Sequence, residues 1–206
     1  MSCKNKVNQK KMIKHIISLT LVLFTLAACA PTGIIAIPSS IADRRTTGVQ
    51  VEDQTIEFKA LYEFQKMNGD FSVSATSYNQ NVLITGESTT QELKDQIQDV
   101  IAKIEGVKSI YNEVLITSSL PLKEKAKSKT KDYGITTNIK ARFFKEETKS
   151  NFSPVHVKVV TERQIVYLMG LVTQQEADEA LQIAKTSQGV VKVKSFFEID
   201  NKYKKN

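Results

Sequence analysis

The stretch Ile165–Glu176, IVYLMGLVTQQE, combines an apolar strand, a glycine and the start of a capped helix. The apolar run follows a polar turn at 162–164, and Gly170 ends it. Thr173 and Glu176 stand three residues apart, the spacing at which a hydroxyl and a carboxylate satisfy the free backbone amides at a helix start. The stretch therefore predicts a strand that leads directly into a helix.

The same order of elements occurs earlier, so the chain contains an internal repeat. An alternating strand, a polar turn, a strand ending at Gly86 and a helix starting at Thr89 recur about 84 residues later. Each of these helices stops at a glycine, and a further alternating strand follows. The segments Gln54–Leu61 and Thr137–Phe144 lie 83 residues apart and align as the first helix of each copy.

Each copy thus reads helix, strand, strand, helix, strand. This order predicts an α+β fold of two tandem domains, each a sandwich with two helices on one face of a small mixed sheet. The predicted boundaries are residues 43–117 for the first domain, 132–201 for the second and 202–206 for a basic tail. Residues 118–131 carry five lysines and one glutamate. We interpret them as a solvated linker, with a dedicated binding patch as the alternative.

The first 28 residues have the parts of an export signal: five lysines without an acidic residue, an apolar run from Ile16, and small residues before Cys29. The ending Leu26–Cys29, LAAC, resembles a lipobox, which implies cleavage before Cys29, a diacylglyceryl group on its thiol, and palmitate on the same residue. Ala30 at the next position favours sorting to the outer membrane under lipoprotein rules. An ordinary secretory signal with an incidental cysteine is the alternative, and Met12 is an alternative start.

Residues 29–42 are small, apolar and uncharged, which is typical of a tether, although the isoleucines at 34, 35 and 37 also suit a membrane interface. The formal charge of the whole chain is +7, but the five signal lysines reduce the mature chain to 24 basic against 22 acidic residues. This balance gives no support to nucleic-acid binding.

Catalytic and metal-binding chemistry is not predicted. Cys3 leaves with the signal and Cys29 is acylated, so no thiol remains for a disulfide or a metal, and no cofactor is expected. The one histidine of the mature chain, His156, is interpreted as a solvated residue on a strand face. The chain is therefore expected not to be an enzyme.

Two helix-strand-strand-helix-strand copies with these glycines resemble BON domains of bacterial envelope proteins. The resemblance extends to a family of dual-BON outer-membrane lipoproteins that are associated with division and envelope stress and bind lipid. It rests on Gly48–Thr55, Val107–Glu113 and Tyr167–Ala177, and it covers residues 43–200. It implies anchoring in the outer membrane facing the periplasm, support of envelope integrity, and binding of anionic phospholipid such as cardiolipin or phosphatidylglycerol.

In this family the lipid contact is made by the first helix of the second domain, which matches a segment from near Ile135 to Phe144 here. Ile139 and Phe143 share one face of such a helix with Ile135, and Lys140 and Phe144 share the opposite, exposed face. The residues implied in lipid binding are Tyr133, Gly134, Ile135, Lys140 and Phe144. Gly134 departs from the family, since relatives carry a membrane-contacting tryptophan there and this chain has none.

Charge supports the second domain as the binder. Residues 43–117 carry 7 basic and 12 acidic residues, whereas residues 132–206 carry 12 and 9. By the 83-residue alignment Glu57 and Leu61 occupy the positions of Lys140 and Phe144. Two alternatives remain: Phe144 packs beneath the loop 145–153, or the protein is a periplasmic adaptor whose partner is the β-barrel assembly machinery or a peptidoglycan-associated protein.

Overall fold

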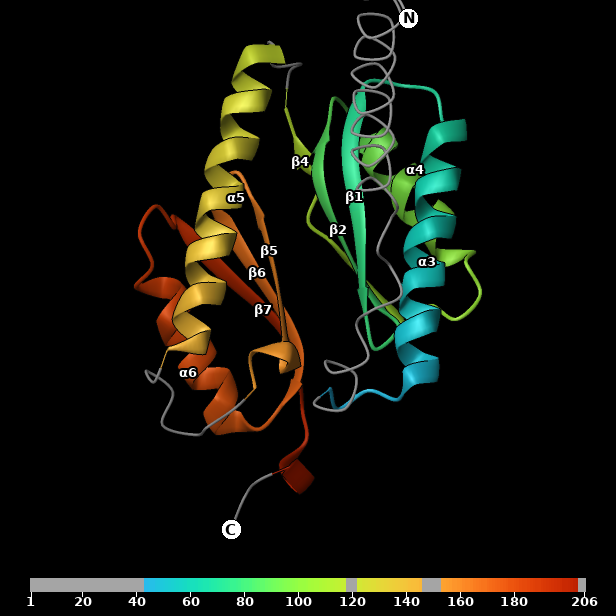
Figure 1. The fold of residues 1–206 in the computed structure, drawn as a ribbon. Helices are drawn as coiled ribbons and strands as arrows, with labels where there is room; N and C mark the ends of the chain where they lie inside the picture. Colours follow the sequence, from blue (N-terminus) through green and yellow to red (C-terminus); the bar gives the residue numbers. More distant parts are fainter. Residues whose placement is uncertain (1–42, 118–121, 146–152, 204–206) are drawn as a thin grey trace, which may run out of the picture. The chain divides into compact units, whose positions relative to one another are not determined.

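The computed structural model describes residues 43–117, 122–145 and 153–203 (Figure 1). The chain divides into two compact units, Met1–Ile37 and Pro38–Asn206, and the second unit contains both copies of the repeat. The export signal, Cys29, the tether and the last residues of the basic tail lie outside the described residues. Every helix in the described ranges is too short or too polar to cross a bilayer.

The first copy forms a mixed sheet covered on one face by two helices (Figure 1). Strand β2 lies in the middle, antiparallel to β1 and parallel to β3 and β4. The elements are α3 (Thr47–Lys66), β1 (Phe71–Tyr78), β2 (Asn81–Ser88), α4 (Gln91–Ala102), β3 (Ser109–Asn112) and β4 (Leu115–Ile116). The predicted order and the α+β class are confirmed.

The second copy repeats this topology with the strand order β5-β6-β7. Strand β6 is antiparallel to β5 and parallel to β7. The elements are α5 (Leu122–Phe144), the 3₁₀ helix η2 (Pro154–His156), β5 (Val157–Glu162), β6 (Ile165–Val172), α6 (Gln174–Lys185), β7 (Lys192–Ile199) and the 3₁₀ helix η3 (Asn201–Tyr203).

Each hairpin turns through two residues with positive φ, as a tight turn between twisted strands requires. These are Asn79 and Gln80 in the first copy and Arg163 and Gln164 in the second. A buried aspartate on the first helix accepts both turn amides: Asp53 at 2.8 and 2.7 Å, and Asp132 at 2.8 and 2.7 Å. The carboxylates therefore fix each hairpin to its helix.

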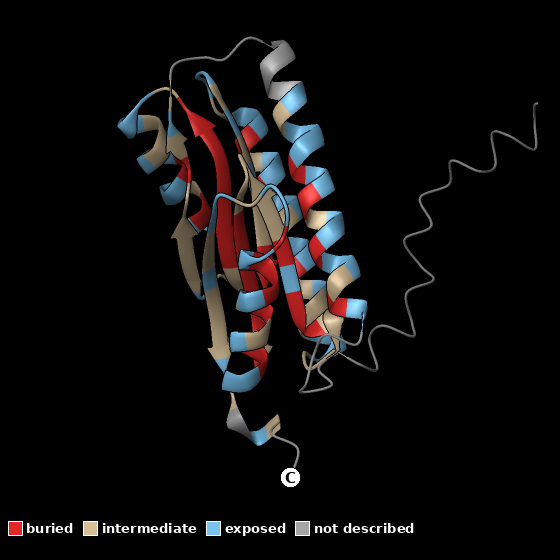
Figure 2. Ribbon diagram, turned by 90° about the vertical axis from the view of Figure 1, so that its left-hand side faces the viewer, coloured by how far each residue is buried: buried red, intermediate tan, exposed pale blue. Residues whose placement is uncertain are grey.

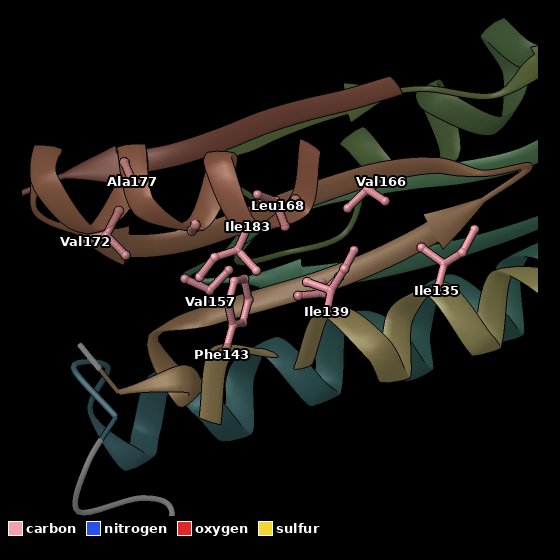
Figure 3. Close-up of a cluster of buried hydrophobic side chains, with 12 residues drawn as sticks. Ile135, Ile139, Phe143, Val157, Val166, Leu168, Val172, Ala177 and Ile183 are labelled. Atoms are coloured by element: carbon pink, nitrogen blue, oxygen red, sulfur yellow. The ribbon is translucent and has the colours of Figure 1, made fainter. Parts of the chain in front are cut away.

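The core of each copy lies between its two helices and its sheet. In the second copy, side chains of α5, α6, β5 and β6 converge there (Figure 3). The central strands β2 and β6 and the inward faces of the helices are buried, the other strands are largely of intermediate exposure, and the outward faces of the helices are exposed (Figure 2). Burying these apolar stripes supplies most of the stability, because burial of one large apolar side chain contributes about 1.5–3 kcal/mol.

The sheet faces without helices also pack together, through a third cluster of buried side chains. It consists of Tyr78, Leu83, Tyr167 and Met169. Beside it, the rings of Tyr111 and Phe196 stack with centroids 4.2 Å apart, and the ion pairs Glu87–Arg163 and Glu113–Lys194 join the same two sheets. The odd-numbered residues of β2 are therefore buried as well as the even-numbered ones.

Of the two N-caps predicted for the second helices, one is confirmed and one is off by one residue. Thr173 and Glu176 form the predicted capping box, with Thr173 N donating to Glu176 Oε2 at 2.8 Å. In the first copy Thr90, not Thr89, is the N-cap, and its hydroxyl accepts from Leu93 N at 3.2 Å. Thr89 and Thr90 are adjacent and either hydroxyl can cap a helix, so the sequence did not decide between them. In the structure the loop before the helix is one residue longer than predicted.

Two further predictions were wrong. The lysine-rich stretch is helical from Leu122, so α5 begins well before Ile135; lysine, alanine and glutamate favour helix, and 122–133 contain no glycine or proline. His156 is 8% exposed, because residues 154–156 form a 3₁₀ turn and the strand alternation starts only at Val157. Its Nδ1 lies 4.0 Å from Glu176 Oε1.

Candidate functional site

The inner face of α5 is as predicted from helical periodicity. Ile135, Ile139 and Phe143 are 4%, 0% and 2% exposed and point into the core of the second domain (Figure 3). Ile135 is therefore removed from the residues predicted to contact lipid, because a side chain enclosed by the core cannot reach a membrane. Ile135 instead holds the helix to the sheet.

The outer face carries Tyr133, Lys140 and Phe144, which we call the α5 outer stripe. Tyr133 and Phe144 are 76% and 74% exposed, and Lys140 is also exposed. Spacings of seven and four residues place the three side chains along one line of the helix. Most of the loop 145–153, beneath which the alternative interpretation placed Phe144, lies outside the described residues. Gly134 lies beside the stripe, and a Cβ built there meets nothing within 4 Å.

Polar contacts fix α5 on the domain. Arg142 Nη1 donates to Ile183 O and Ser187 Oγ, both at 2.8 Å, which joins the last turn of α5 to α6. Thr136 Oγ1 bonds Thr161 Oγ1 of β5 at 2.7 Å, and Asp132 holds the hairpin turn. The outer stripe is thus carried on a helix whose rotation about its axis is fixed.

The two first helices differ in charge. Helix α5 contains seven basic and two acidic residues, whereas α3 contains two basic and four acidic residues. Lys127, Lys129 and Lys131 of α5 are exposed. Residues predicted to form a separate linker therefore add positive charge to the same helix that carries the outer stripe.

The structure corrects the alignment of the two helices. Buried Asp53, Ile56, Ala60 and Phe64 of α3 correspond to buried Asp132, Ile135, Ile139 and Phe143 of α5, a separation of 79 residues and not 83. The error is four residues, close to one helical turn, so the pattern of faces is nearly unchanged by it. The equivalents of Lys140 and Phe144 are consequently Leu61 and Gln65, and Glu57 corresponds to Thr136.

Sequence reasoning missed a polar junction at the start of the folded unit. Arg44 forms a two-pronged ion pair with Glu176 at 2.6 and 2.8 Å and donates to Leu171 O at 2.9 Å, all in the second domain. Arg45 bonds Asp53 at 2.7 Å in the first domain. The sequence feature that could have indicated this junction is the pair Arg44 and Arg45, which comes shortly after the uncharged segment 30–42.

The described residues contain no cluster of side chains that could bind a metal ion. Within residues 43–117, 122–145 and 153–203, no three histidine, cysteine, aspartate or glutamate side chains gather closely enough to hold an ion.

Two repeated domains of this topology, each with a glycine two residues before the end of its central strand, define a tandem α+β protein; the strands continue past Gly86 and Gly170, which were predicted to end them. Residues 52–118 and 131–201 match the BON domain family, and the chain belongs to that family. The family predicted from the sequence is confirmed.

The relatives extend over most of the chain. It is 33% identical over 166 residues to the outer membrane lipoprotein DolP of Haemophilus influenzae, covering 79% of this chain and 82% of that protein. It is 30% identical over 154 residues to a 21 kDa hemolysin of Actinobacillus pleuropneumoniae, covering 73% and 76%.

Among solved structures, the C-terminal domain of CdsD, a structural protein of the type III secretion system of Chlamydia trachomatis, is similar at 13% identity. It covers 69% of this chain and 96% of that domain, with a TM-score of 0.25. This likeness is too low to inform fold or function.

Proposed function

We propose that the protein is an outer-membrane lipoprotein, anchored through Cys29 and facing the periplasm, that docks the α5 outer stripe on anionic phospholipid and so supports envelope integrity. The observation that carries the proposal is the pair of exposed rings, Tyr133 and Phe144, on either side of exposed Lys140. Aromatic rings favour the membrane interface, and an ammonium beside them remains among phosphates.

The charge of α5 supports the choice of an anionic surface. A net charge of +5 on α5 attracts cardiolipin or phosphatidylglycerol, each basic group near the surface contributing about 1 kcal/mol. The outer membrane location of the Haemophilus influenzae relative supports the anchor at Cys29. An acyl anchor supplies retention and α5 supplies a second membrane contact, and two such signals bind far more stably than one.

Vesicle co-sedimentation of residues 43–206, which lack the anchor, tests the proposal. Phosphatidylcholine vesicles with and without phosphatidylglycerol or cardiolipin are compared. Binding is expected only with the anionic lipids. Lys140→Glu reverses one charge at the surface and should lower the partition coefficient about thirtyfold. Phe144→Asp should lower it at least as much, because the ring is replaced by a second anion.

The first copy offers matched controls at the structurally equivalent positions. Leu61→Glu and Gln65→Asp introduce the same side chains on the exposed face of α3. Because α3 carries a net charge of −2, these changes should leave the partition coefficient unchanged. Equal losses from both helices would refute the assignment of binding to α5.

A further inference from the structure

The outer edge of β1 is open to another strand. Among the described residues, strand β1 pairs with β2 alone, and Tyr78 and Asn81 face each other across the two-residue turn. That pair exchanges hydrogen bonds, so alternate residues counted back from Tyr78 direct their main chain toward β2, and the residues between them, beginning with Ser77, direct theirs away from it. Ser77 N donates outward to Glu57 Oε1 at 2.9 Å, which confirms this direction. The main-chain groups of Val73 and Ala75 therefore point outward too.

Strand β1 lacks the features that usually protect an edge. Its sequence, FSVSATSY, contains no charged residue and no proline over eight residues. The equivalent strand of the second copy, β5, is six residues long, contains Lys158 and Glu162, and follows Pro154 in η2. Charge, proline and shortness are the means by which proteins keep edge strands unpaired, so only the second copy is protected.

An apolar groove runs beside this edge. A hollow of about 310 Å³ lies between α3 and β1, and its lining residues are Gln54, Glu57, Phe58, Leu61 and Phe64 of α3 and Val73, Ser74 and Ala75 of β1. Phe58 and Leu61 are 70% and 53% exposed. Their equivalents on α5, 79 residues later, are Thr137 and Lys140. An apolar groove next to an open edge is thus a property of the first copy, and exposed apolar surface of this kind marks interaction sites.

The surroundings of the edge are acidic. A second hollow of about 630 Å³ adjoins the first at Ser74, and its lining includes Asp132, Glu162 and Glu87, the last paired with Arg163, against Lys129. Burial, followed by the nearby carboxylates of Asp132 and Glu87, raises the pKa of Glu162. The first domain as a whole carries a net charge of −5. Such a surface repels both an anionic membrane and the same domain of a second copy.

We propose that the β1 edge binds an extended segment of a partner protein that carries net positive charge. The segment pairs with the main chain of Val73 and Ala75 and places an apolar side chain between Phe58 and Leu61. In this mode main-chain hydrogen bonds supply affinity, and the groove and the carboxylates select the sequence. The groove beside the edge is formed by α3 and β1 and contains no residue of the α5 outer stripe, although Tyr133 of the stripe lines the second hollow.

Binding of defined peptides to the full chain in uncharged phosphatidylcholine vesicles tests the proposal. The probe is a blocked eight-residue peptide of alternating valine and lysine. One control alternates valine and glutamate, and the other is the lysine peptide with its main-chain nitrogens methylated. The lysine peptide should bind at least tenfold more tightly than either control and should slow hydrogen exchange of the β1 amides. Because these vesicles carry no net charge, the result is independent of lipid binding by α5.

Substitutions identify the surface. Leu61→Lys and Phe58→Thr introduce the residues that the second copy carries and should each weaken peptide binding about tenfold. Val191→Lys changes another exposed apolar residue, on the second domain, and should have no effect. Equal binding of all three peptides, or protection of amides outside β1, would overturn the proposal. Concentration-dependent protection of β1 without peptide would also overturn it, in favour of a second copy at this edge.

Discussion

Asp132 shows how one side chain fixes an element far from it in sequence. Its carboxylate accepts the amides of Arg163 and Gln164, and Asp53 does the same for the first hairpin. The turn residues have positive φ, which costs free energy for side chains other than glycine. Fixed acceptors for both amides offset that cost and join the hairpin to the helix.

Asp132→Ala should therefore lower the free energy of unfolding by about 3 kcal/mol, because two bonds to a charged acceptor are lost at a buried position. Urea denaturation measures the change. Asp178→Ala, at an exposed position of α6 bonded only to Gln174, is the control and should leave the midpoint unchanged within error. Similar losses from both variants would show that the turn amides find other partners.

Gly134 is an open position beside the α5 outer stripe. It is exposed on α5, and the space around its Cα is open, so a large side chain fits there without displacing a neighbour. Gly134→Trp should raise the partition coefficient on phosphatidylglycerol vesicles about tenfold, because part of the indole leaves water at the interface. Co-sedimentation measures it.

Gly134→Ala serves as the control for helix stability. It should stabilise α5 by about 0.8–1 kcal/mol, because glycine is a poor helix former, and should leave lipid binding unchanged. If alanine raised lipid binding as much as tryptophan does, helix stability and not the ring would be the cause.

At the scale of elements, the sequence identified which face of α5 is buried but not the register between the two first helices. A shift of four residues turns a helix by only about 40°, so apolar residues stay on nearly the same face. What fixes the register is the contact of Asp53 and Asp132 with hairpin turns, and this contact is not local in sequence. The start of α5 at Leu122 was also not predicted, because a lysine-rich stretch is compatible with both a solvated linker and a helix.

The lysines at the beginning of α5 lead to a prediction for the whole helix. Replacing Lys127, Lys129 and Lys131 by glutamine should weaken binding to phosphatidylglycerol vesicles by about 3 kcal/mol at low salt, and by much less at 0.5 M salt, where charges are screened. The same replacement of exposed Lys59, Lys103 and Lys108 in the first domain should have little effect. A salt-independent loss would indicate that these residues act through folding instead.

At the scale of the whole folded unit, adjacent arginines join elements of both domains where the tether ends. Arg44 reaches Glu176, and its guanidinium lies 4.4 Å above the ring of Tyr203. Arg45 reaches Asp53 and lies 3.9 Å above the ring of Tyr78. The family resemblance placed a domain start near residue 43, but a junction between domains depends on their packing, which local patterns do not encode.

Arg44→Ala should lower the free energy of unfolding by about 3 kcal/mol, because Glu176 would keep its charge at a buried position without its partner. The effect should depend on pH. Burial opposes ionisation of Glu176, but hydrogen bonds from Arg44 and from Thr173 N outweigh it and lower its pKa below the ordinary 4.5. This contribution stabilises the fold above that value and is lost as the pH falls through the folded-state pKa.

Thermal unfolding at pH 7 and pH 3 should therefore show a larger difference between wild type and Arg44→Ala at pH 7. Lys66→Ala, which removes an exposed ion pair with Glu63, is the control and should leave the midpoint unchanged at both pH values. An Arg44→Ala effect of the same size at pH 3 would assign its role to packing on Tyr203 and to the bond with Leu171 O. The charge of Glu176 would then contribute nothing to holding the two domains together.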